Sequence, residues 1–229
     1  MSCFDPLFDR YDSLVFFDTE TTGLNFEQDE IIEFSAVVLQ RQNGQPTVTV
    51  EYDELICTDP GTVIPPFIED LTGITNEAVR EKGISKAQVC ADISRIFAGN
   101  ALLLAYNAHF DLSFLFYLLL KHGDPAALRG KDKVDLLTVY KDRHSYPHKL
   151  CNAIEVYGLQ GKVVNSHRAV DDVLATVAVM EAMLQEKDDM QHYINLFGYN
   201  SKYGLQGKPI RSIVYKSQDY DPPKPLYEL

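Results

Sequence analysis

Residues 14–23 read Leu-Val-Phe-Phe-Asp-Thr-Glu-Thr-Thr-Gly, an apolar run that ends in two carboxylates. The short aromatic run predicts a buried strand. Side chains alternate between the faces of a strand, so Asp18 and Glu20 point the same way, roughly 6 to 7 Å apart. Such a pair is tolerated if both groups are solvated, if one is protonated, or if a divalent cation lies between them. Hard oxygen ligands favour Mg²⁺ or Mn²⁺, although surface carboxylates at a strand end give the same local pattern.

The bulk composition is typical of a globular domain. Of the 229 residues, 45% are hydrophobic and 24% are charged, which is enough for one sizeable core and does not require two domains. No apolar stretch reaches the length of about 18 residues that a membrane helix needs, and the first residues lack the basic and apolar regions of a secretory signal. We therefore expect a cytoplasmic protein with no membrane partner.

Charge and cysteine content exclude two further classes. A net charge of −12 argues against broad nonspecific binding to a polyanion, because such binding depends on Lys and Arg neutralising phosphates. A nucleic-acid enzyme is not excluded, since carboxylates that hold metal ions count as negative while the metals reverse the local field. The four cysteines form no C-x-x-C pair, so neither a zinc knuckle nor a disulfide framework is indicated.

The remaining pattern predicts an α/β fold in layers. After the first strand, strand patterns occupy residues 31–39, 47–57, 101–105 and the start of 133–140, which we take as the last strand. Helical patterns occupy residues 67–71, 76–81, 85–97, 110–120, 150–157 and 168–185. The first three strands form an antiparallel meander with a turn signal at 42–45. Strands followed by alternating strands and helices indicate a mixed five-stranded sheet flanked by helices.

Three more polar residues stand out from their surroundings. Asp111 opens the apolar stretch 110–120, where an ionised carboxylate needs a partner. A helix cap and a metal ion would each serve. His167 precedes the last long helix, and an imidazole with its ordinary pKa of about 6.5 can accept a proton near neutral pH. Helical periodicity alone does not choose between Asp171 and Asp172 as the acidic residue that follows it.

Three segments together resemble the motifs of the DEDDh 3′-to-5′ exonuclease family. They are residues 17–24 (Phe-Asp-Thr-Glu-Thr-Thr-Gly-Leu), 107–115 (Asn-Ala-His-Phe-Asp-Leu-Ser-Phe-Leu) and 167–172 (His-Arg-Ala-Val-Asp-Asp). Two shorter segments, 71–75 and 135–137, fit the same pattern. Within the family, the chain looks most like the proofreading epsilon subunits of bacterial DNA polymerase III and their stand-alone relatives.

The resemblance implies a ribonuclease-H-like fold and a metal-dependent enzyme of DNA replication or repair that removes nucleotides from a DNA 3′ end. The family spacing between the histidine and the aspartate selects Asp172. The implied catalytic residues are His167 as general base and four carboxylates that hold two Mg²⁺ or Mn²⁺ ions, Asp18, Glu20, Asp111 and Asp172. Two such ions can bind both the attacking and the leaving oxygen of an in-line displacement.

The family pattern also implies contacts to the terminal nucleotide and a class of partner. The residues concerned are Thr19, Thr22, Gly23, Leu24, Asn107 and Phe110. A glycine lets the backbone approach a ligand and a leucine can pack on a base, but a simple turn and core packing explain the same residues. The expected partners are single-stranded DNA with a 3′ end and a DNA polymerase subunit. RNA trimming and a non-catalytic polymerase-associated subunit remain alternatives, because contacts to a 2′-hydroxyl cannot be read from sequence.

The resemblance ends before the last part of the chain. We expect residues 1–187 to form the exonuclease domain and residues 188–229 a Tyr- and Gly-rich extension. Three interpretations of this extension stay open. It folds back over its own domain, it docks a polymerase or another partner, or its aromatic and basic residues contact single-stranded nucleic acid.

Overall fold

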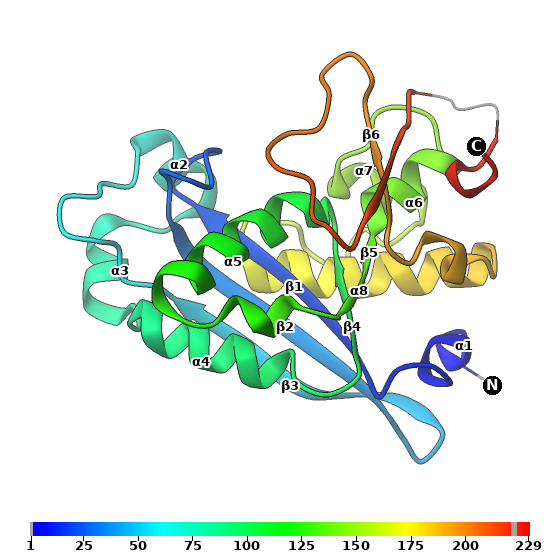
Figure 1. Cartoon of the computed structure of the whole chain (residues 1–229), viewed down its shortest axis with the longest axis horizontal. Coiled ribbons are helices and arrows are strands. Elements are labelled where there is room, and N and C mark those ends of the chain that lie inside the picture. The colour runs from blue at the N-terminus through cyan, green and yellow to red at the C-terminus, as the bar shows by residue number, and fades with distance from the viewer. Residues whose placement is uncertain (1, 221–223) are drawn as a thin grey trace.

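A mixed five-stranded sheet forms the centre of the computed structural model, which describes residues 2–220 and 224–229 (Figure 1). Pro222 and Pro223, in the proline-rich part of the extension, lie outside the described residues. The strands of this sheet are β1 (Ser13–Thr21), β2 (Ile31–Gln42), β3 (Gln45–Leu55), β4 (Ala101–Ala105) and β5 (Asp132–Asp135). Their order is β3-β2-β1-β4-β5, with β1, β2 and β3 antiparallel and β1, β4 and β5 parallel. The predicted mixed sheet is therefore confirmed.

Helices cover both faces of the sheet. They are α1 (Asp5–Phe8), α2 (Pro66–Thr72), α3 (Asn76–Lys82), α4 (Lys86–Ile96), α5 (Ala108–His122), α6 (Leu136–Arg143), α7 (Leu150–Val156) and α8 (Ala169–Glu186), with a short 3-10 helix η1 (Pro125–Leu128). Figure 1 shows the sheet between α8 on one side and α4 with α5 on the other. No helix among the described residues is both long enough and apolar enough to cross a membrane.

Local sequence signals account for where several elements begin and end. Asn43 and Gly44 both have positive φ angles, 50° and 78°, which make a two-residue turn matched to the twist of the β2–β3 hairpin. The two strands therefore run right up to this turn, further than the sequence pattern indicated. The Ser85 hydroxyl accepts a hydrogen bond from the Gln88 amide and caps α4. Gly73, with φ of 72°, ends α2 in the left-handed conformation.

Alternation along the strands divides the core into two layers. In β1, Leu14 and Phe16 pack on the α8 side, while Val15 and Phe17 pack on the side of α4 and α5. The strand continues through Thr21, so the two acidic residues of the motif lie within β1 and not after it. Because side chains alternate, both carboxylates leave the sheet on the α8 side.

The C-terminal segment is more regular than the sequence pattern indicated. It contains a second 3-10 helix η2 (Met190–Tyr193), a parallel pair of short strands, β6 (Leu196–Tyr199) and β7 (Val214–Ser217), and a final 3-10 turn η3 (Leu226–Glu228). The strand predicted at the start of 133–140 is β5, the edge of the central sheet, but the two strands of the extension were not predicted. The pair was missed because four-residue strands joined by a long loop leave too little periodicity to recognise.

This segment folds back over its own domain, which is the first of the three interpretations. Tyr193 is buried in the core on the α8 side, and Phe197 is buried in the core on the α5 side. Asp142 of α6 ties the segment down, because its carboxylate accepts hydrogen bonds from the Tyr193 hydroxyl (3.0 Å), the Gln218 amide (2.6 Å) and the Leu226 backbone N–H (2.5 Å).

We expect Asp142→Ala to lower the free energy of unfolding by about 2 to 4 kcal/mol, because it leaves three partly buried donors without an acceptor. Urea denaturation followed by circular dichroism measures the change. Asp70→Ala, at an exposed site on α2, is the matched control and should change stability by less than about 0.5 kcal/mol. Equal stability of the two variants would contradict the role given to Asp142.

Candidate metal centre

Three carboxylates from two elements meet on the α8 side of β1. Asp18 and Glu20 come from β1, and Asp172 comes from the first turn of α8. One oxygen of each lies within 4.8 Å of the others. Asp18 and Glu20 are half-buried and Asp172 is buried. The structure therefore brings together three of the four carboxylates that the sequence singled out, in a geometry that one divalent cation could bridge.

Asp111, the fourth carboxylate, reaches this cluster from the other layer. It lies in the first turn of α5, is almost fully buried, and accepts hydrogen bonds from the Thr19 amide (3.0 Å) and the Thr19 hydroxyl (2.7 Å). Its carboxylate therefore binds β1, and its place in the first turn of α5 also lets it complement the helix dipole, as considered from sequence. Its charge acts on Asp18, whose pKa is raised well above its ordinary value by burial first and by Asp111 next.

The cluster holds more negative charge than its surroundings can stabilise when all four groups are ionised. Burial, reinforced by Asp172 and Glu33, raises the pKa of Glu20 to about 8. Burial also raises the pKa of Asp111 to about 7, despite the hydrogen bonds from Thr19. A divalent cation would favour the charged forms and remove this penalty. The donor set consists of hard carboxylate oxygens, which fits Mg²⁺ or Mn²⁺.

Glu33, which was not predicted from the sequence, holds the N-terminal end of α8 against β2. It lies opposite Glu20 in the β1–β2 register and is fully buried. Its carboxylate forms an ion pair with Arg168, with 2.9 Å between Nε and Oε1, and accepts a hydrogen bond from the Ala169 amide (2.8 Å). It thus binds the first free N–H of α8 and the residue that caps this helix. A single Glu within the apolar run 31–39 is the signal that could have revealed it.

The loop before α8 presents His167 beside Asp172. His167 has a left-handed φ of 57° and an exposed side chain, and its charge lowers the pKa of Asp172 against the larger effect of burial. The Asn165 side-chain amide donates to Asp172 Oδ1 at 2.6 Å. Asp171 is instead held by the Ser166 hydroxyl. The structure therefore shows that Asp172, and not Asp171, joins the carboxylate cluster, a choice that periodicity alone could not make.

Of the six residues expected to contact a nucleotide, Thr19 binds Asp111 and the other five fall into two groups. Thr22 and Gly23 have local structural reasons. The Thr22 hydroxyl accepts a hydrogen bond from the Glu30 amide (3.0 Å), and a Cβ on Gly23 would collide with the Asp29 carboxylate. Phe110 packs on Phe114 with 4.9 Å between ring centroids. The turn and packing explanations therefore account for these three residues.

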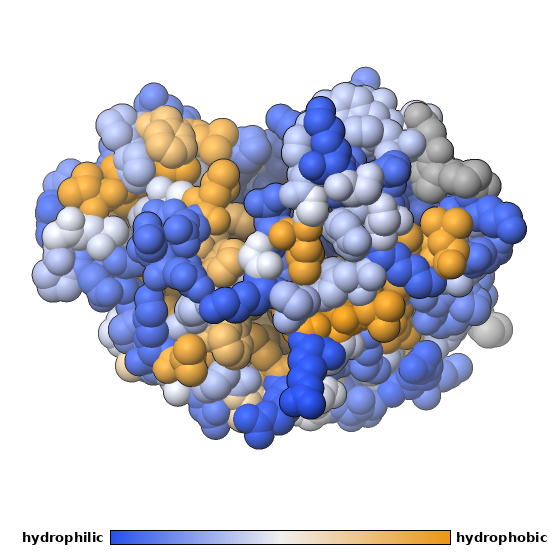
Figure 2. All heavy atoms as spheres, turned by 45° about the horizontal axis from the view of Figure 1, so that its top comes forward, coloured by the Kyte–Doolittle hydropathy of each residue, from blue (hydrophilic) through white to orange (hydrophobic). Residues whose placement is uncertain are grey.

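Leu24 and Asn107 are exposed, and Leu24 is 83% accessible. Two further large apolar side chains, Phe67 and Leu71 of α2, are exposed as well. Figure 2 shows hydrophobic residues gathered on the α2 side of the molecule, beside a recess that separates this side from the C-terminal segment. This surface is open to a ligand.

Asp135, at the end of β5, fixes the start of α5. Its carboxylate accepts hydrogen bonds from the backbone amides of Asn107 (2.9 Å) and Ala108 (3.1 Å) and from the Thr138 hydroxyl (2.7 Å). Asn107 itself has a left-handed φ of 70°. This contact sets the position of the first turn of α5 and, with it, the position of Asp111. The sequence pattern marked residues 135–137 without giving Asp135 this role.

Comparisons with known proteins place this arrangement among nucleases. The family model RNase_T, described as Exonuclease, matches residues 15–180. The DNA polymerase III PolC-type protein of Clostridium perfringens is 29% identical over 226 residues, which cover 95% of this chain and 15% of that protein. DNA polymerase III subunit epsilon of Treponema pallidum is 30% identical over 188 residues, which cover 79% of this chain and 81% of that subunit.

A solved structure supports the likeness in fold. Exonuclease I of E. coli in complex with a dA16 oligonucleotide matches with a TM-score of 0.69 and 23% identity, over 80% of this chain and 42% of that one. The chain spans about 15% of the length of the PolC-type relatives that it matches.

We expect Mg²⁺ or Mn²⁺ to raise the melting temperature more at pH 8 than at pH 5. Carboxyl groups with raised pKa values keep protons in the folded state that the unfolded chain has lost. Their contribution to stability is present below an ordinary carboxyl pKa of about 4 and is lost as the pH rises through the folded values. The melting temperature in EDTA should therefore fall between pH 5 and pH 8, and the cation should restore it.

Glu20→Gln isolates this effect, because it removes the group whose pKa is about 8. In EDTA it should melt higher than the unaltered protein at pH 8 and show a flatter dependence on pH. Glu77→Gln, at an exposed site on α3, serves as the control. A melting temperature in EDTA that rises steadily from pH 5 to pH 8 and is insensitive to Glu20→Gln would contradict the argument.

We expect Glu33→Gln to weaken Mn²⁺ binding by about tenfold, since residues that orient metal ligands typically contribute 10- to 100-fold. The change removes the carboxylate that holds Arg168 and the start of α8, and it also removes a negative charge next to the cluster. Calorimetric titration with Mn²⁺ measures the affinity. Glu51→Gln, exposed on β3, should bind as the unaltered protein does, and an unchanged affinity of Glu33→Gln would rule out the positioning role.

Proposed function

Since the chain belongs to the exonuclease family whose model it matches over residues 15–180, we propose that it hydrolyses DNA one nucleotide at a time from the 3′ end, with divalent cations as cofactors. The observation that carries the proposal is the meeting of carboxylates from β1, α5 and α8 beside one exposed histidine. A glycosidase-type pair of carboxylates would need neither this histidine nor the third and fourth acidic groups.

The carboxylates supply the cation site. Asp18, Glu20 and Asp172 would hold Mg²⁺ or Mn²⁺, and Asp111 would complete a second position on the α5 side of Asp18. Bound cations of this kind lower the pKa of water and stabilise negative charge that develops on a phosphoryl group. The protein contributes the fixed spacing, because β1 holds two of the ligands and the first turns of α5 and α8 hold the others.

His167 acts as the general base in this proposal. Its side chain is exposed, so it can exchange a proton with solvent, and it lies close enough to Asp172 to affect that carboxylate's pKa. It takes the proton of the attacking water as the new bond to phosphorus forms. The Asn165 amide and the backbone of the loop hold Asp172 in place while the neighbouring imidazole accepts the proton.

The names of the relatives guide the choice of substrate and partner. Two of them are DNA polymerase III proteins, and the E. coli Exonuclease I structure holds a dA16 oligonucleotide. We extend this to single-stranded DNA as substrate, to a role in proofreading or repair, and to a DNA polymerase subunit as partner.

Digestion of 5′-labelled and 3′-labelled single-stranded DNA and RNA, with Mg²⁺, Mn²⁺ or EDTA, tests the proposal. We expect a ladder of 5′-labelled DNA shortened from the 3′ end, seen only with metal. His167→Ala should lower the rate by about 10²- to 10⁴-fold, the usual range for loss of a general base. His122→Ala, at an exposed position on α5, is the control and should act as the unaltered protein does.

The outcomes separate the alternatives. Activity in EDTA, or full activity of Asp18→Asn, would overturn the metal-dependent reaction. A faster loss of RNA than of DNA would move the assignment to RNA trimming. No cleavage of either polymer with metal present would leave the non-catalytic polymerase-associated subunit.

A further inference from the structure

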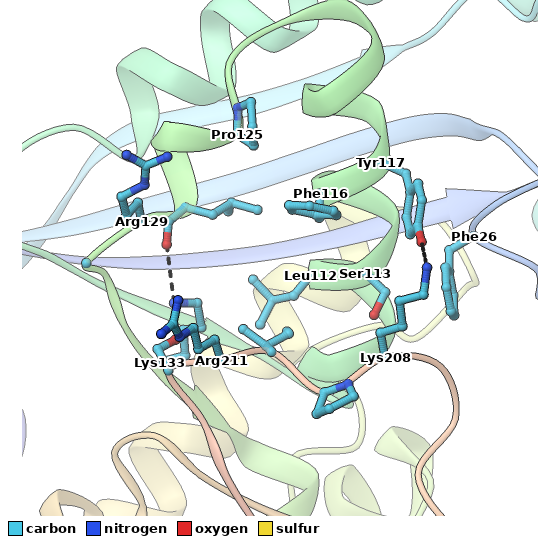
Figure 3. Close-up of a pocket in the computed structure, with 15 residues that line it drawn as sticks. Phe26, Leu112, Ser113, Phe116, Tyr117, Pro125, Arg129, Lys133, Lys208 and Arg211 are labelled. Atoms are coloured by element: carbon cyan, nitrogen blue, oxygen red, sulfur yellow. Dashed lines mark hydrogen bonds between the residues drawn. The ribbon is translucent and has the colours of Figure 1, made fainter.

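A second site lies on the opposite side of α5 from the metal centre. A cavity of about 580 Å³ opens between α5, η1 and the C-terminal segment (Figure 3). Its helical wall includes Leu112, Ser113 and Phe116. Ser113 follows Asp111 by two residues, which is about 200° around a helix with 3.6 residues per turn. The cavity is therefore separate from the carboxylate cluster, and its volume falls in the usual range of about 300 to 1,000 Å³ for small-molecule pockets.

The C-terminal segment builds one wall and is fastened to α5. The Nε2 atom of His109 lies 2.6 Å from the Gln206 carbonyl oxygen. Gly207 lies so close to Phe26 that a Cβ would collide with the ring. Phe26 in turn stacks on Tyr117 of α5, with 5.5 Å between centroids and 27° between planes. These contacts keep the wall in place without a ligand, so the cavity is preformed.

Three cationic side chains line one end of the cavity, the buried Lys133 and the exposed Arg129 and Arg211. Lys133 is 2% exposed, and its Nζ donates to the carbonyl oxygens of Lys131 (2.6 Å) and Leu128 (3.4 Å) and to the Ser212 hydroxyl (3.4 Å). Among the described residues, no carboxylate forms an ion pair with Lys133, Arg129 or Arg211, and the two guanidinium groups have no hydrogen-bond partner. Buried charges in proteins are normally paired. Lys133 is therefore an unusual buried cation, whereas Arg129 and Arg211 are exposed, so their guanidinium groups are accessible to an anion.

Apart from Lys208, which pairs with Glu27, and two serines, the remaining lining is mostly apolar and aromatic. Phe116 is 43% exposed although it lines the cavity, and Ile210 and Pro209 of the C-terminal segment lie on the other side. Figure 3 shows Arg129, Lys133 and Arg211 at one end of the cavity and the rings of Phe116, Tyr117 and Phe26 along it. A ligand for this site needs an anionic group at one end and a flat apolar body.

We propose that this cavity binds a nucleotide, with its phosphate against Lys133, Arg129 and Arg211 and its base against Phe116. The phosphate of a nucleotide carries nearly two negative charges at neutral pH as a monoester and one within a strand, and it offers several oxygens to these cations. Arg forks match phosphate oxygens, and aromatic side chains stack on bases of any sequence. The nucleotide is either free or part of a strand. The choice of nucleotide over other anions rests on the proposed function, because a nuclease releases nucleoside monophosphates close to this cavity.

Isothermal titration calorimetry of the full chain in EDTA tests the site without relying on nuclease activity. Thymidine 5′-monophosphate is the first probe, with thymidine, inorganic phosphate and octanoate as comparisons. We expect the monophosphate to bind at one site, at least tenfold tighter than each of the three. Arg129→Ala and Arg211→Ala should each weaken it by about tenfold, as for the loss of a charge-assisted hydrogen bond. Arg80→Ala, exposed on α3, is the matched control and should change nothing.

Repeating the titration with Asp18→Asn and with an eight-residue oligo(dT) separates the sources. Binding of the monophosphate that survives Asp18→Asn and is lost in the arginine variants supports a free nucleotide. Binding of the oligonucleotide alone, with the same loss in those variants, supports a nucleotide within a strand. No binding of either, equal binding of octanoate, or binding that the arginine variants leave intact would overturn the site, whatever the nuclease assay gives.

Discussion

Repulsion among four carboxylates at one end of β1 is the constraint on which the rest of this structure depends. Burial raises the pKa values of Asp18, Glu20 and Asp111, and the charge of neighbouring cluster members adds to this effect at Asp18 and Glu20, so the groups lie together at a cost in free energy. Hydrogen bonds from β1 and from the loop before α8 hold two of these carboxylates in place. Thr19 of β1 holds Asp111, and Asn165 holds Asp172. Such a site is suited to strong binding of divalent cations, because the cation removes a penalty that the fold already carries.

Buried carboxylates that lie next to the cluster have ion-pair or hydrogen-bond partners of their own. Glu33 faces Glu20 across the β1–β2 pair, yet it is neutralised by Arg168 and by the start of α8. Glu33, although it carries the same charge as Glu20, thereby holds α8, the helix that carries Asp172. The same logic places Asp135 under the start of α5, where it binds two backbone amides and fixes the turn that carries Asp111. Two buried acids thus position Asp172 and Asp111 without belonging to the cluster themselves.

The C-terminal segment forms part of a site with an excess of positive charge, in contrast to the negative charge of the carboxylate cluster. It packs into both layers of the core through Tyr193 and Phe197, and it also closes a cavity with three cations that no described carboxylate pairs. Helix α5 lies between this cavity and the metal centre, with Asp111 on one face and Ser113 on the other. One helix therefore separates an acidic site from a basic site, and each lacks the counter-charge that a bound cation or anion would supply.

Sequence alone determined the parts of this protein that depend on local pattern. Periodicity and turn residues predicted the strand at 101–105 with its observed bounds, the meander before it and the long helix after residue 168. The resemblance to the exonuclease family, carried by three motifs, pointed to Asp18, Glu20, Asp111, His167 and Asp172, of which Asp18, Glu20 and Asp172 lie within 4.8 Å of one another. Only the tertiary structure decided the rest. Glu33 opposite Glu20, Asp135 beneath α5 and Lys133 at the cavity acquire their roles from residues far away in the chain. No local pattern encodes such contacts, because the electrostatic state of a buried charge depends on which distant groups the fold brings within a few ångströms of it.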